Sequence, residues 1–262
     1  MYEDLDRPPL RADALTRALL ADGWRVEVLP TAGSTNALLA ERARGGEPAG
    51  LVLVAEEQTA GRGRLDRSWV APPRAGLTFS VLLQPALPVA QWPWLPLLTG
   101  LAVTRVLREQ AGVDAVLKWP NDVLVGGRKL CGLLAEVPVP GLVVMGIGLN
   151  VTTRREELPH DLATSLVLEG SAVLDRDLLL RAVLRELGRV LAGDPAGDPA
   201  GDLVEGQAAY RALCSSLGAR VRVELPGGAT VEGTAEAVDT DGRLVVDGTP
   251  YGAGDVVHLR PA

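Results

Sequence analysis

The segment Gln58–Trp69 combines, at short spacing, residue types that can bind an anion. It reads Gln-Thr-Ala-Gly-Arg-Gly-Arg-Leu-Asp-Arg-Ser-Trp. Its glycines leave backbone N–H groups accessible, and Arg62 and Arg64 add guanidinium groups that bind phosphate or carboxylate. Arg67 brings further charge, and the indole of Trp69 offers a flat apolar surface, as expected where a nucleotide is held through both phosphate and ring. The alternative is a solvated loop, because glycine and arginine are abundant in this chain.

Lysine is almost absent from the chain. Only Lys118 and Lys129 occur, beside 24 arginines. An ammonium group is a compact donor that a planar guanidinium cannot imitate where geometry is tight. We therefore expect both lysines to act in the chemistry. The alternative is chance within a composition biased toward arginine.

Polar residues follow the predicted strand that ends at Lys118. A proline-containing turn presents the amide of Asn121 and the carboxylate of Asp122. Such residues beside proline often only form a turn, but the lysine before them favours a site. Two glycines at 126–127 predict a two-residue hairpin turn, which places Lys129 just beyond the turn on the second strand.

A group of hydroxyl and amide side chains, Ser34-Thr35-Asn36, precedes a predicted helix. Capping of that helix by Ser34 or Thr35 is sufficient to explain them. The functional alternative is that the hydroxyls and the free N–H groups of the helix start bind a polar head group.

The predicted strand Leu142–Val151 contains Gly146 and Gly148, which face the same side because strand residues two apart share a face. A ligand can approach the backbone where two side chains are missing. Close packing against a neighbouring strand is the alternative, and Asn150 favours a ligand.

The remaining pattern predicts the elements that position these residues. Helices are expected over Asp13–Asp22, after Ser34, and over Leu95–Gln110, Asp175–Leu191 and Leu203–Leu217. Strands are expected over Trp24–Leu29, Leu51–Ala55 and Gly76–Leu83. The tandem repeat Gly193–Asp202 is expected to be a mobile surface loop. Val81–Leu83 and Leu142–Val144 are candidates for edge strands on which a partner could extend the sheet.

From Ala219 onward, several short strands separated by Pro-Gly-Gly and Asp-Gly turns predict a small β module. We place the domain boundary between a main domain over residues 1–215 and this module over residues 216–262. The module is near the lower size limit for folding alone.

Composition excludes several classes of function. The net charge of −7 argues against broad binding of DNA. The histidines, His160 and His258, lie far from each other and from both cysteines in sequence, and Cys131 and Cys214 show no metal-ligand spacing and no disulfide framework. No apolar run is long enough to cross a membrane, and no leader segment is evident. We expect a cytoplasmic protein.

Five ordered motifs resemble those of the bacterial biotin protein ligases. They are Ser34-Thr-Asn36, Gln58-Thr-Ala-Gly-Arg-Gly-Arg64 with Trp69, Lys118-Trp-Pro-Asn-Asp122, Gly127-Arg-Lys-Leu-Cys-Gly132 and Gly146-Ile-Gly-Leu-Asn150. The resemblance extends over nearly the whole chain. It implies an α+β fold, with a mixed β-sheet and flanking helices like those of class II aminoacyl-tRNA synthetases, followed by a small SH3-like β-barrel.

The resemblance also implies a two-step reaction. Biotin and Mg-ATP would give biotinyl-5'-AMP and pyrophosphate, and a lysine of a biotin carboxyl carrier domain of an acyl-CoA carboxylase would then accept the biotinyl group. Because a carboxylate is already ionised at neutral pH, the first step needs positioning and charge neutralisation rather than a general base. The scarcity of histidine agrees with that chemistry.

Residue roles follow from the motif match. The resemblance assigns Arg64, Lys129 and Lys118 to catalysis, with Lys129 between the biotin carboxylate and the α-phosphate. It assigns to biotin binding Ser34, Thr35, Asn36, Gln58, Gly61, Arg62, Arg64, Lys129, Gly132, Gly146 and Gly148. It assigns to nucleotide binding Arg64, Arg67, Trp69, Asn121, Lys129 and Asn150. Asp122 is the candidate contact for magnesium or for the acceptor lysine.

One position departs from the pattern of many relatives, which carry a glycine where this chain has Asp66. Two alternatives to biotin ligation remain open. A lipoate or octanoate ligase would share the fold and a related lysine but lacks this pair of arginine and lysine motifs. A regulator that senses biotin and binds DNA is disfavoured by the acidic charge and by an opening segment too short for a helix-turn-helix unit.

Overall fold

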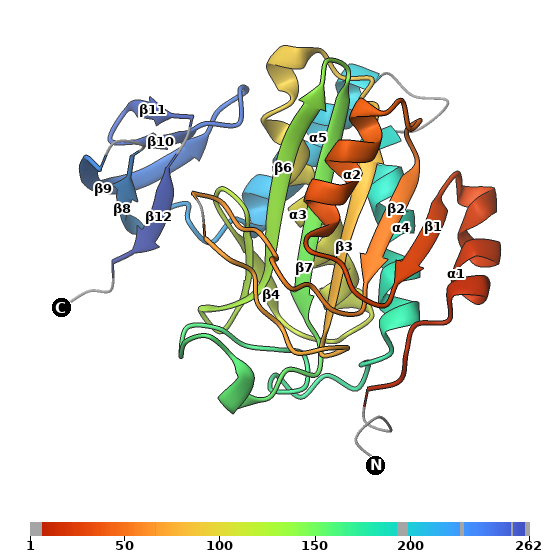
Figure 1. Cartoon of the computed structure of the whole chain (residues 1–262). Coiled ribbons are helices and arrows are strands. Elements are labelled where there is room, and N and C mark those ends of the chain that lie inside the picture. Colours follow the sequence, from red (N-terminus) through yellow and green to blue (C-terminus); the bar gives the residue numbers. More distant parts are fainter. Residues whose placement is uncertain (1–6, 66, 193–198, 226–227, 253, 260–262) are drawn as a thin grey trace.

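The computed structural model describes residues 7–65, 67–192, 199–225, 228–252 and 254–259. A seven-stranded mixed sheet forms the centre of the molecule (Figure 1). Its strands are β1 (Arg25–Leu29), β2 (Leu51–Ala55), β3 (Gly76–Leu83), β4 (Ala115–Lys118), β5 (Asp122–Val125), β6 (Arg128–Val139) and β7 (Leu142–Asn150). They follow the order β1-β2-β3-β7-β6-β5-β4, and only β1 and β2 pair in parallel.

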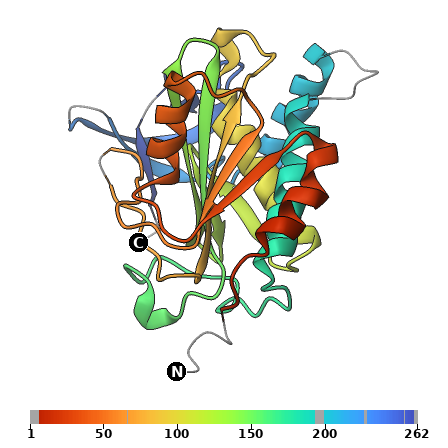
Figure 2. The same ribbon diagram turned by 45° about the vertical axis from the view of Figure 1, so that its right-hand side comes forward.

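Helices cover both faces of this sheet (Figures 1 and 2). The helices are α1 (Ala12–Leu19), α2 (Thr35–Arg44), α3 (Trp94–Glu109), α4 (Arg176–Ala192) and α5 (Pro199–Leu213), with short 3-10 turns at Leu20–Asp22, Val89–Gln91 and Arg155–Glu157. Helix α2 lies alone on the front face in Figure 1, across β3, β7 and β6. Helices α3, α4 and α5 pack together behind the sheet.

Strand alternation decides which residues face α2. On β7, the side chains of Met145, Ile147 and Leu149 enter the main core, so the intervening Gly146 and Gly148 face the opposite side. The same period places polar residues of β3 on the α2 side, because Leu77, Phe79 and Val81 point to the core. The α2 face is therefore the polar, glycine-rich face.

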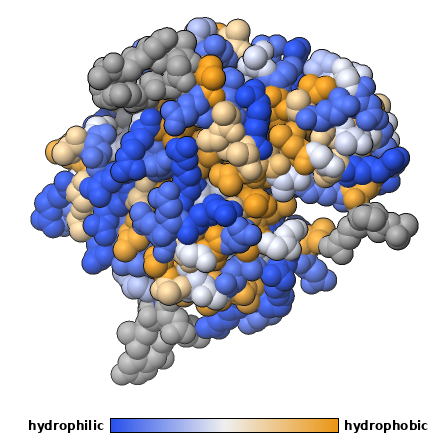
Figure 3. All heavy atoms as spheres, turned by 180° about the vertical axis from the view of Figure 1, so that it is seen from behind, coloured by the Kyte–Doolittle hydropathy of each residue, from blue (hydrophilic) through white to orange (hydrophobic). Residues whose placement is uncertain are grey.

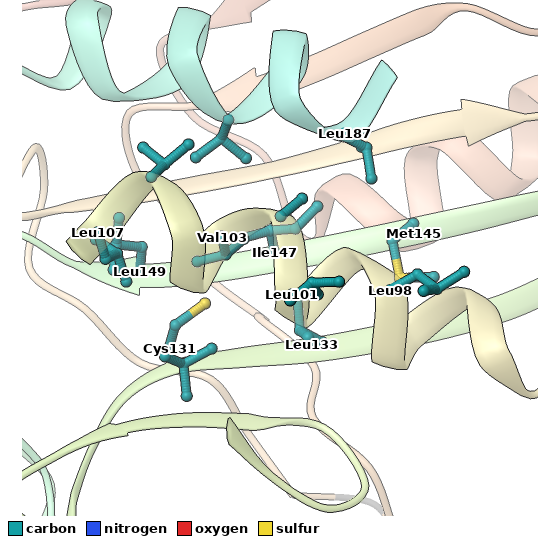
Figure 4. Packing of buried hydrophobic residues seen from close by; sticks show 14 of the residues in the cluster. Leu98, Leu101, Val103, Leu107, Cys131, Leu133, Met145, Ile147, Leu149 and Leu187 are labelled. Atoms are coloured by element: carbon teal, nitrogen blue, oxygen red, sulfur yellow. The ribbon is translucent and has the colours of Figure 1, made fainter. Parts of the chain in front are cut away.

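The main core lies between the sheet and α3 and α4. Figure 4 shows Leu98, Leu101 and Val103 of α3 meeting Met145 and Ile147 of β7. A second, smaller cluster joins α2 to the sheet and consists of Leu39, Ala40, Ala43, Leu51, Leu53, Leu82 and Val144. The sheet is thus held from both sides, but the packing under α2 is confined to one end of that helix.

The C-terminal module is a five-stranded antiparallel sheet, ordered β11-β10-β9-β8-β12. Its strands are β8 (Arg220–Glu224), β9 (Thr230–Val238), β10 (Leu244–Val246), β11 (Thr249–Tyr251) and β12 (Asp255–His258). Within the described residues β11 and β12 do not pair, so the expected barrel is not closed. The apolar side chains of this sheet belong to the same core cluster as the main sheet.

Most predicted elements are confirmed, and two expectations were wrong. Helix α5 begins at Pro199, so the end of the predicted mobile loop is helical; proline is well tolerated at the first helical position. Residues 193–198 lie outside the described residues. The predicted edge strands are central, because β3 pairs with β2 and β7, and β7 pairs with β3 and β6. Their uniformly apolar sequences reflect burial on both faces rather than an edge.

Seen from behind, the surface exposes hydrophilic and hydrophobic residues together (Figure 3). Within the described part of the chain, no helix is both long and apolar enough to cross a membrane.

Candidate active site

The start of α2 supplies the first group of site residues. Ser34 is the N-cap, and its hydroxyl accepts a hydrogen bond from the N–H of Ala37 at 3.4 Å. The next residue, Thr35, donates its backbone N–H to Oε1 of Gln58 at 2.8 Å, and its hydroxyl lies 3.0 Å from the same oxygen. The expected cap is confirmed, and Gln58 is brought to the helix start from the end of β2.

Asn36 is buried, and its amide is fully used by the protein. Its Nδ2 donates to the carbonyl of Leu134 at 3.2 Å and to the carboxylate of Glu136 at 2.9 Å, while its Oδ1 accepts from Ser80 Oγ at 2.6 Å. A Cβ at Gly146 would overlap this amide. Gly146 therefore makes room for Asn36, which joins α2 to β3, β6 and β7.

Thr35, Asn36, Gln58 and Ser80 form what we call the head-group cluster. Ser80 Oγ lies 2.7 Å from Thr35 Oγ1 as well as 2.6 Å from Asn36 Oδ1, and Thr35 Oγ1 also reaches Gln58. These three oxygen–oxygen contacts need three protons, but the two hydroxyls supply only two. One contact therefore lacks a donor at any moment, so the cluster can accept an N–H from a ligand.

A glycine floor lies beside this cluster. Gly148 and Gly132 are paired across β7 and β6, and the indole of Trp69 lies over both. A Cβ at Gly148 would overlap the indole, and one at Gly132 would lie 3.1 Å from it and 3.1 Å from Cε of Lys129. The expected close approach to the strand is confirmed, and in this structure the approaching group is Trp69.

Little open space lies beside the indole of Trp69 in this structure. The space beside Trp69, Gln58 and Thr78 is only about 10 Å³, which is about the room one water needs. A larger cavity of about 650 Å³ is lined by Arg7, Leu10, Pro73 and other residues, but by none of the predicted site residues. In this structure the indole of Trp69 occupies the glycine floor.

The two lysines meet at one carboxylate. Lys129 Nζ lies 2.6 Å from Asp122 Oδ1, and Lys118 Nζ lies 3.9 Å from Asp122 Oδ2. Strand pairing explains this convergence, since Asp122 is opposite Lys118 across β4–β5 and opposite Gly132 across β5–β6. Lys129 also lies 5.9 Å from the ring centre of Trp69, within cation–π range.

Burial shifts the pKa of Lys118. Burial lowers its pKa from the ordinary lysine value of 10.5, and the neighbouring carboxylate of Asp122 offsets only part of that effect. Its ammonium group has thus lost hydration that an anionic ligand can replace.

Arg64 connects the loop to two other parts of the chain. Its Nη1 lies 3.3 Å from Asn121 Oδ1 and 3.3 Å from the carbonyl of Gly254, and 4.0 Å from Asp255. Burial lowers the pKa of Arg64, although the guanidinium remains charged. Arg67 pairs with the same Asp255. The start of β12 in the C-terminal module therefore contacts the arginine loop, Gly61–Trp69.

The arginine loop is a small closed unit. Trp69 donates its N–H to the carbonyl of Gly61 at 2.9 Å, and Arg62 bridges to Ser68. A Cβ at Gly61 would overlap the carbonyl of Trp69, so glycine is required there. Arg62 Nη1 lies 3.2 Å from Glu136 Oε1. Asp66 lies outside the described residues.

Asn150 acts on the segment that holds Lys129. Its Nδ2 donates to the carbonyl of Thr164 at 2.9 Å. The N–H of Thr164 donates to the carbonyl of Lys129 at 2.9 Å, and the N–H of Lys129 donates to the carbonyl of Leu162 at 2.7 Å. Asn150 is thus linked through Thr164 to the backbone of Lys129.

Other candidate chemistry is not assembled. Among the described residues, no group of three or more histidine, cysteine, aspartate or glutamate side chains is placed to bind a metal ion. Burial raises the pKa of the Cys131 thiol to about 12, so it is not a nucleophile.

Four residues of the neighbourhood had not been predicted. Ser80 belongs to the head-group cluster, and Glu136 accepts a hydrogen bond from Asn36 of that cluster. Asp255 faces the arginine loop, and His258 lies near Lys118 with its Nε2 3.0 Å from Ser216 Oγ. Alternation along β3 and β6 could have placed the first two on the polar face. No local pattern in the sequence predicts Asp255 or His258 as site residues, because they reach the site from the C-terminal module.

Comparison with known families identifies the family of the chain. A model of the biotin/lipoate A/B protein ligase family matches residues 28–150, and a model of the biotin protein ligase C terminal domain matches residues 216–259. The chain is 46% identical over 267 residues to the biotin--[acetyl-CoA-carboxylase] ligase of Mycobacterium tuberculosis, covering 97% of each chain. It is 35% identical over 175 residues to the bifunctional ligase/repressor BirA of Escherichia coli, covering 65% of this chain and 54% of that protein.

Solved structures show the same architecture. The biotin protein ligase of Aquifex aeolicus in complex with biotin and ATP has a TM-score of 0.74 at 30% identity, covering 90% of this chain and 99% of that chain. The Leishmania major enzyme in complex with biotinyl-5-AMP has a TM-score of 0.59 at 26% identity, covering 90% and 98%. Fold and site together define the class of biotin and lipoate ligases. Within that class, the chain belongs to the biotin protein ligases.

Proposed function

We propose that the chain joins biotin to ATP, supplied as Mg-ATP, and then transfers the biotinyl group to a lysine of the biotin carboxyl carrier domain of an acyl-CoA carboxylase. Two comparisons support the proposal. The Mycobacterium tuberculosis relative is named for an acetyl-CoA carboxylase acceptor, and the Leishmania major structure contains the acyl-adenylate intermediate. We place the reaction in the cytoplasm, with the carrier as its protein partner.

The observation that carries the choice of biotin is the head-group cluster. Its four oxygens hold one proton too few, so it favours a ligand that donates an N–H. The cyclic urea of biotin has two N–H donors, whereas the hydrocarbon of octanoate and the dithiolane of lipoate have none. A donor that fills this deficit gains a buried hydrogen bond, and a ligand without one leaves the deficit in place.

The first step is an attack of the biotin carboxylate oxygen on the α-phosphorus of ATP. A bond to that phosphorus forms, the bond to the β-phosphate oxygen breaks, and pyrophosphate leaves. In the second step the carrier amine attacks the acyl carbon, AMP leaves, and the amine loses a proton. The first step brings two anions together, so fixed positive charges are the main requirement.

We assign these positive charges to Lys129 and Arg64. Lys129 would stand between the carboxylate and the α-phosphate, since its ammonium lies beside Gly132 of the glycine floor. Lys118 would contact the phosphates or assist the acceptor lysine. Arg67, Trp69, Asn121 and Asn150 would contact the nucleotide; one face of Trp69 already lies on Gly148, which leaves the other for adenine.

Magnesium enters in this scheme as part of the substrate Mg-ATP. Asp122 is the nearest candidate carboxylate, but both of its oxygens face lysine ammonium groups. A carboxylate already neutralised by two cations attracts a metal weakly, so we favour a role in holding the two lysines.

The test is mass spectrometry of the product after incubation with Mg-ATP and one of three acids: biotin, lipoate or octanoate. We expect an adenylate from the incubation with biotin and none from the incubations with lipoate or octanoate. A second incubation with an isolated biotin carboxyl carrier domain should shift the mass of that domain by one biotinyl group. Adenylate formed only from lipoate or octanoate would overturn the proposal.

A further inference from the structure

Glu136 links two parts of the site that are far apart in sequence. Its Oε2 accepts the Nδ2 hydrogen of Asn36 at 2.9 Å, and its Oε1 lies 3.2 Å from Nη1 of Arg62. One carboxylate thus faces both the start of α2 and the arginine loop. We infer that Glu136 is a positioning residue that holds Arg62, and with it the arginine loop, beside the head-group cluster. The inference rests on the proposed function and adds a residue to its biotin site.

The Asn36 side of this link is rigid. Asn36 is 4% exposed, and its amide is held by Ser80 and by the carbonyl of Leu134 in addition to Glu136. It also lies directly against Gly146, where a side chain would displace it. Glu136 is therefore held by a buried amide, and its second oxygen is presented to Arg62.

On the other side of the link, Arg62 is joined to the rest of the arginine loop. Arg62 bridges to Ser68, and Gly61 accepts from the N–H of Trp69, so these contacts join the two ends of the loop. A second attachment, from Arg64 to Asn121, lies nearer the phosphate end of the site. Loss of the first attachment alone should therefore affect the acid more than the nucleotide.

The size of the effect follows from exposure. The side chain of Arg62 is 52% exposed and that of Glu136 is 26% exposed, and ion pairs of this kind contribute little to folding stability. The substitution Glu136→Gln keeps an acceptor for Asn36 and removes only the charge. We expect the KM for biotin to rise about two- to five-fold, the range that such a pair can supply, with the KM for Mg-ATP and the melting temperature unchanged.

The experiment is a double-mutant cycle of Glu136→Gln and Arg62→Gln, read as KM for biotin, KM for Mg-ATP and the dissociation rate of biotinyl-adenylate. If Glu136 acts through Arg62, Glu136→Gln weakens biotin binding and speeds adenylate release in the wild-type background, but adds nothing once Arg62 is replaced. The matched control is Glu232→Gln, which removes the charge from an exposed pair with Arg222 in the C-terminal module.

Two results would overturn the inference. One is an unchanged KM for biotin in Glu136→Gln; the other is an equal effect of that substitution with and without Arg62, which would show that Glu136 serves only Asn36. Failure of the proposed function is distinguishable, because the wild-type protein itself would then form no biotinyl-adenylate.

Discussion

At the scale of single residues, one carboxylate between the only two lysines is the most informative feature of the site. Asp122 lies 2.6 Å from Lys129 and 3.9 Å from Lys118. An anionic ligand that reaches the two lysines would compete with this internal counter-ion.

Lys129→Ala should abolish adenylate formation while the fold survives. Removing one preorganised charge or donor from a transition state typically costs about 100- to 1000-fold in rate, whereas Lys129 is 32% exposed and anchors no core packing. The measurement is adenylate yield together with a thermal melt. Arg108→Gln is the control, because it removes only an exposed pair with Asp114 and a hydrogen bond to the carbonyl of Ala115. A normal yield from Lys129→Ala would refute the assignment.

The affinity for Mg-ATP should depend on the protonation of Lys118. In a plot of affinity against pH, this dependence should appear as a limb at a pH below the range in which lysine usually titrates. Burial lowers its pKa from 10.5, so the ammonium loses its proton, and the phosphates lose a positive partner, at a lower pH than for an exposed lysine. Affinity should therefore fall as pH rises through that lowered pKa. Lys118→Arg, which stays charged, should remove the limb in a titration of Kd against pH; an identical limb in the variant would show that another group titrates.

At the scale of elements, β6 and β7 form a floor on which both Asn36 and Trp69 lie. The glycines of this floor are spaced by two residues along β7, and Gly132 is opposite Gly148 across the strand pair. The backbone of β6 and β7 is therefore in direct contact with the amide of Asn36 in α2 and with the indole of Trp69 in the arginine loop. Through this contact Trp69 occupies the glycine floor.

Gly148→Ala should push Trp69 off the floor. The added methyl group overlaps the indole, and overpacking of this kind costs about 1–3 kcal/mol in the free energy of unfolding. The measurement is denaturant unfolding combined with tryptophan fluorescence, which should shift to the red. Gly188→Ala in α4 is the matched control, because its methyl would lie 3.9 Å from Trp24 and should stabilise the helix by up to about 1 kcal/mol.

At the scale of the whole molecule, the C-terminal module is joined to the main sheet by shared core and by buried hydrogen bonds. The indoles of Trp94 and Trp119 donate to the carbonyls of Thr240 at 2.8 Å and Gly242 at 3.0 Å. Asp255 of the same module faces Arg64 and Arg67. The sequence boundary at residue 215 separates two sheets that do not have separate cores.

A chain ending at residue 215 should therefore be strongly destabilised. It would leave two buried indole N–H groups without acceptors, at about 1–3 kcal/mol each, and would expose apolar core, against a total stability of about 5–15 kcal/mol. Circular dichroism and thermal unfolding of the shortened chain test this expectation. Trp119→Phe in the full chain controls for loss of one hydrogen bond, and a shortened chain that melts like the full one would support two independent domains.

Local features of the site could be predicted from the sequence because they depend on near neighbours. The glycines at 126–127 adopt positive φ and close the hairpin that carries Lys129, and Ser34 caps α2. Alternation along β7 turns Gly146 and Gly148 to one face. These features follow from side-chain period, turn geometry and capping, each acting within a few residues.

Only the tertiary structure decided how these pieces meet. Arg64 bonds a carbonyl 190 residues away, Asn36 and Glu136 are 100 residues apart, and no local pattern encodes either contact. The order of strands also decided that β3 and β7 lie at the centre of the sheet, where the sequence suggested edges. The sequence by itself determined which chemical groups are present and how each element presents them, whereas long-range packing determined which of them share a site, because such contacts depend on the free energy of the whole fold.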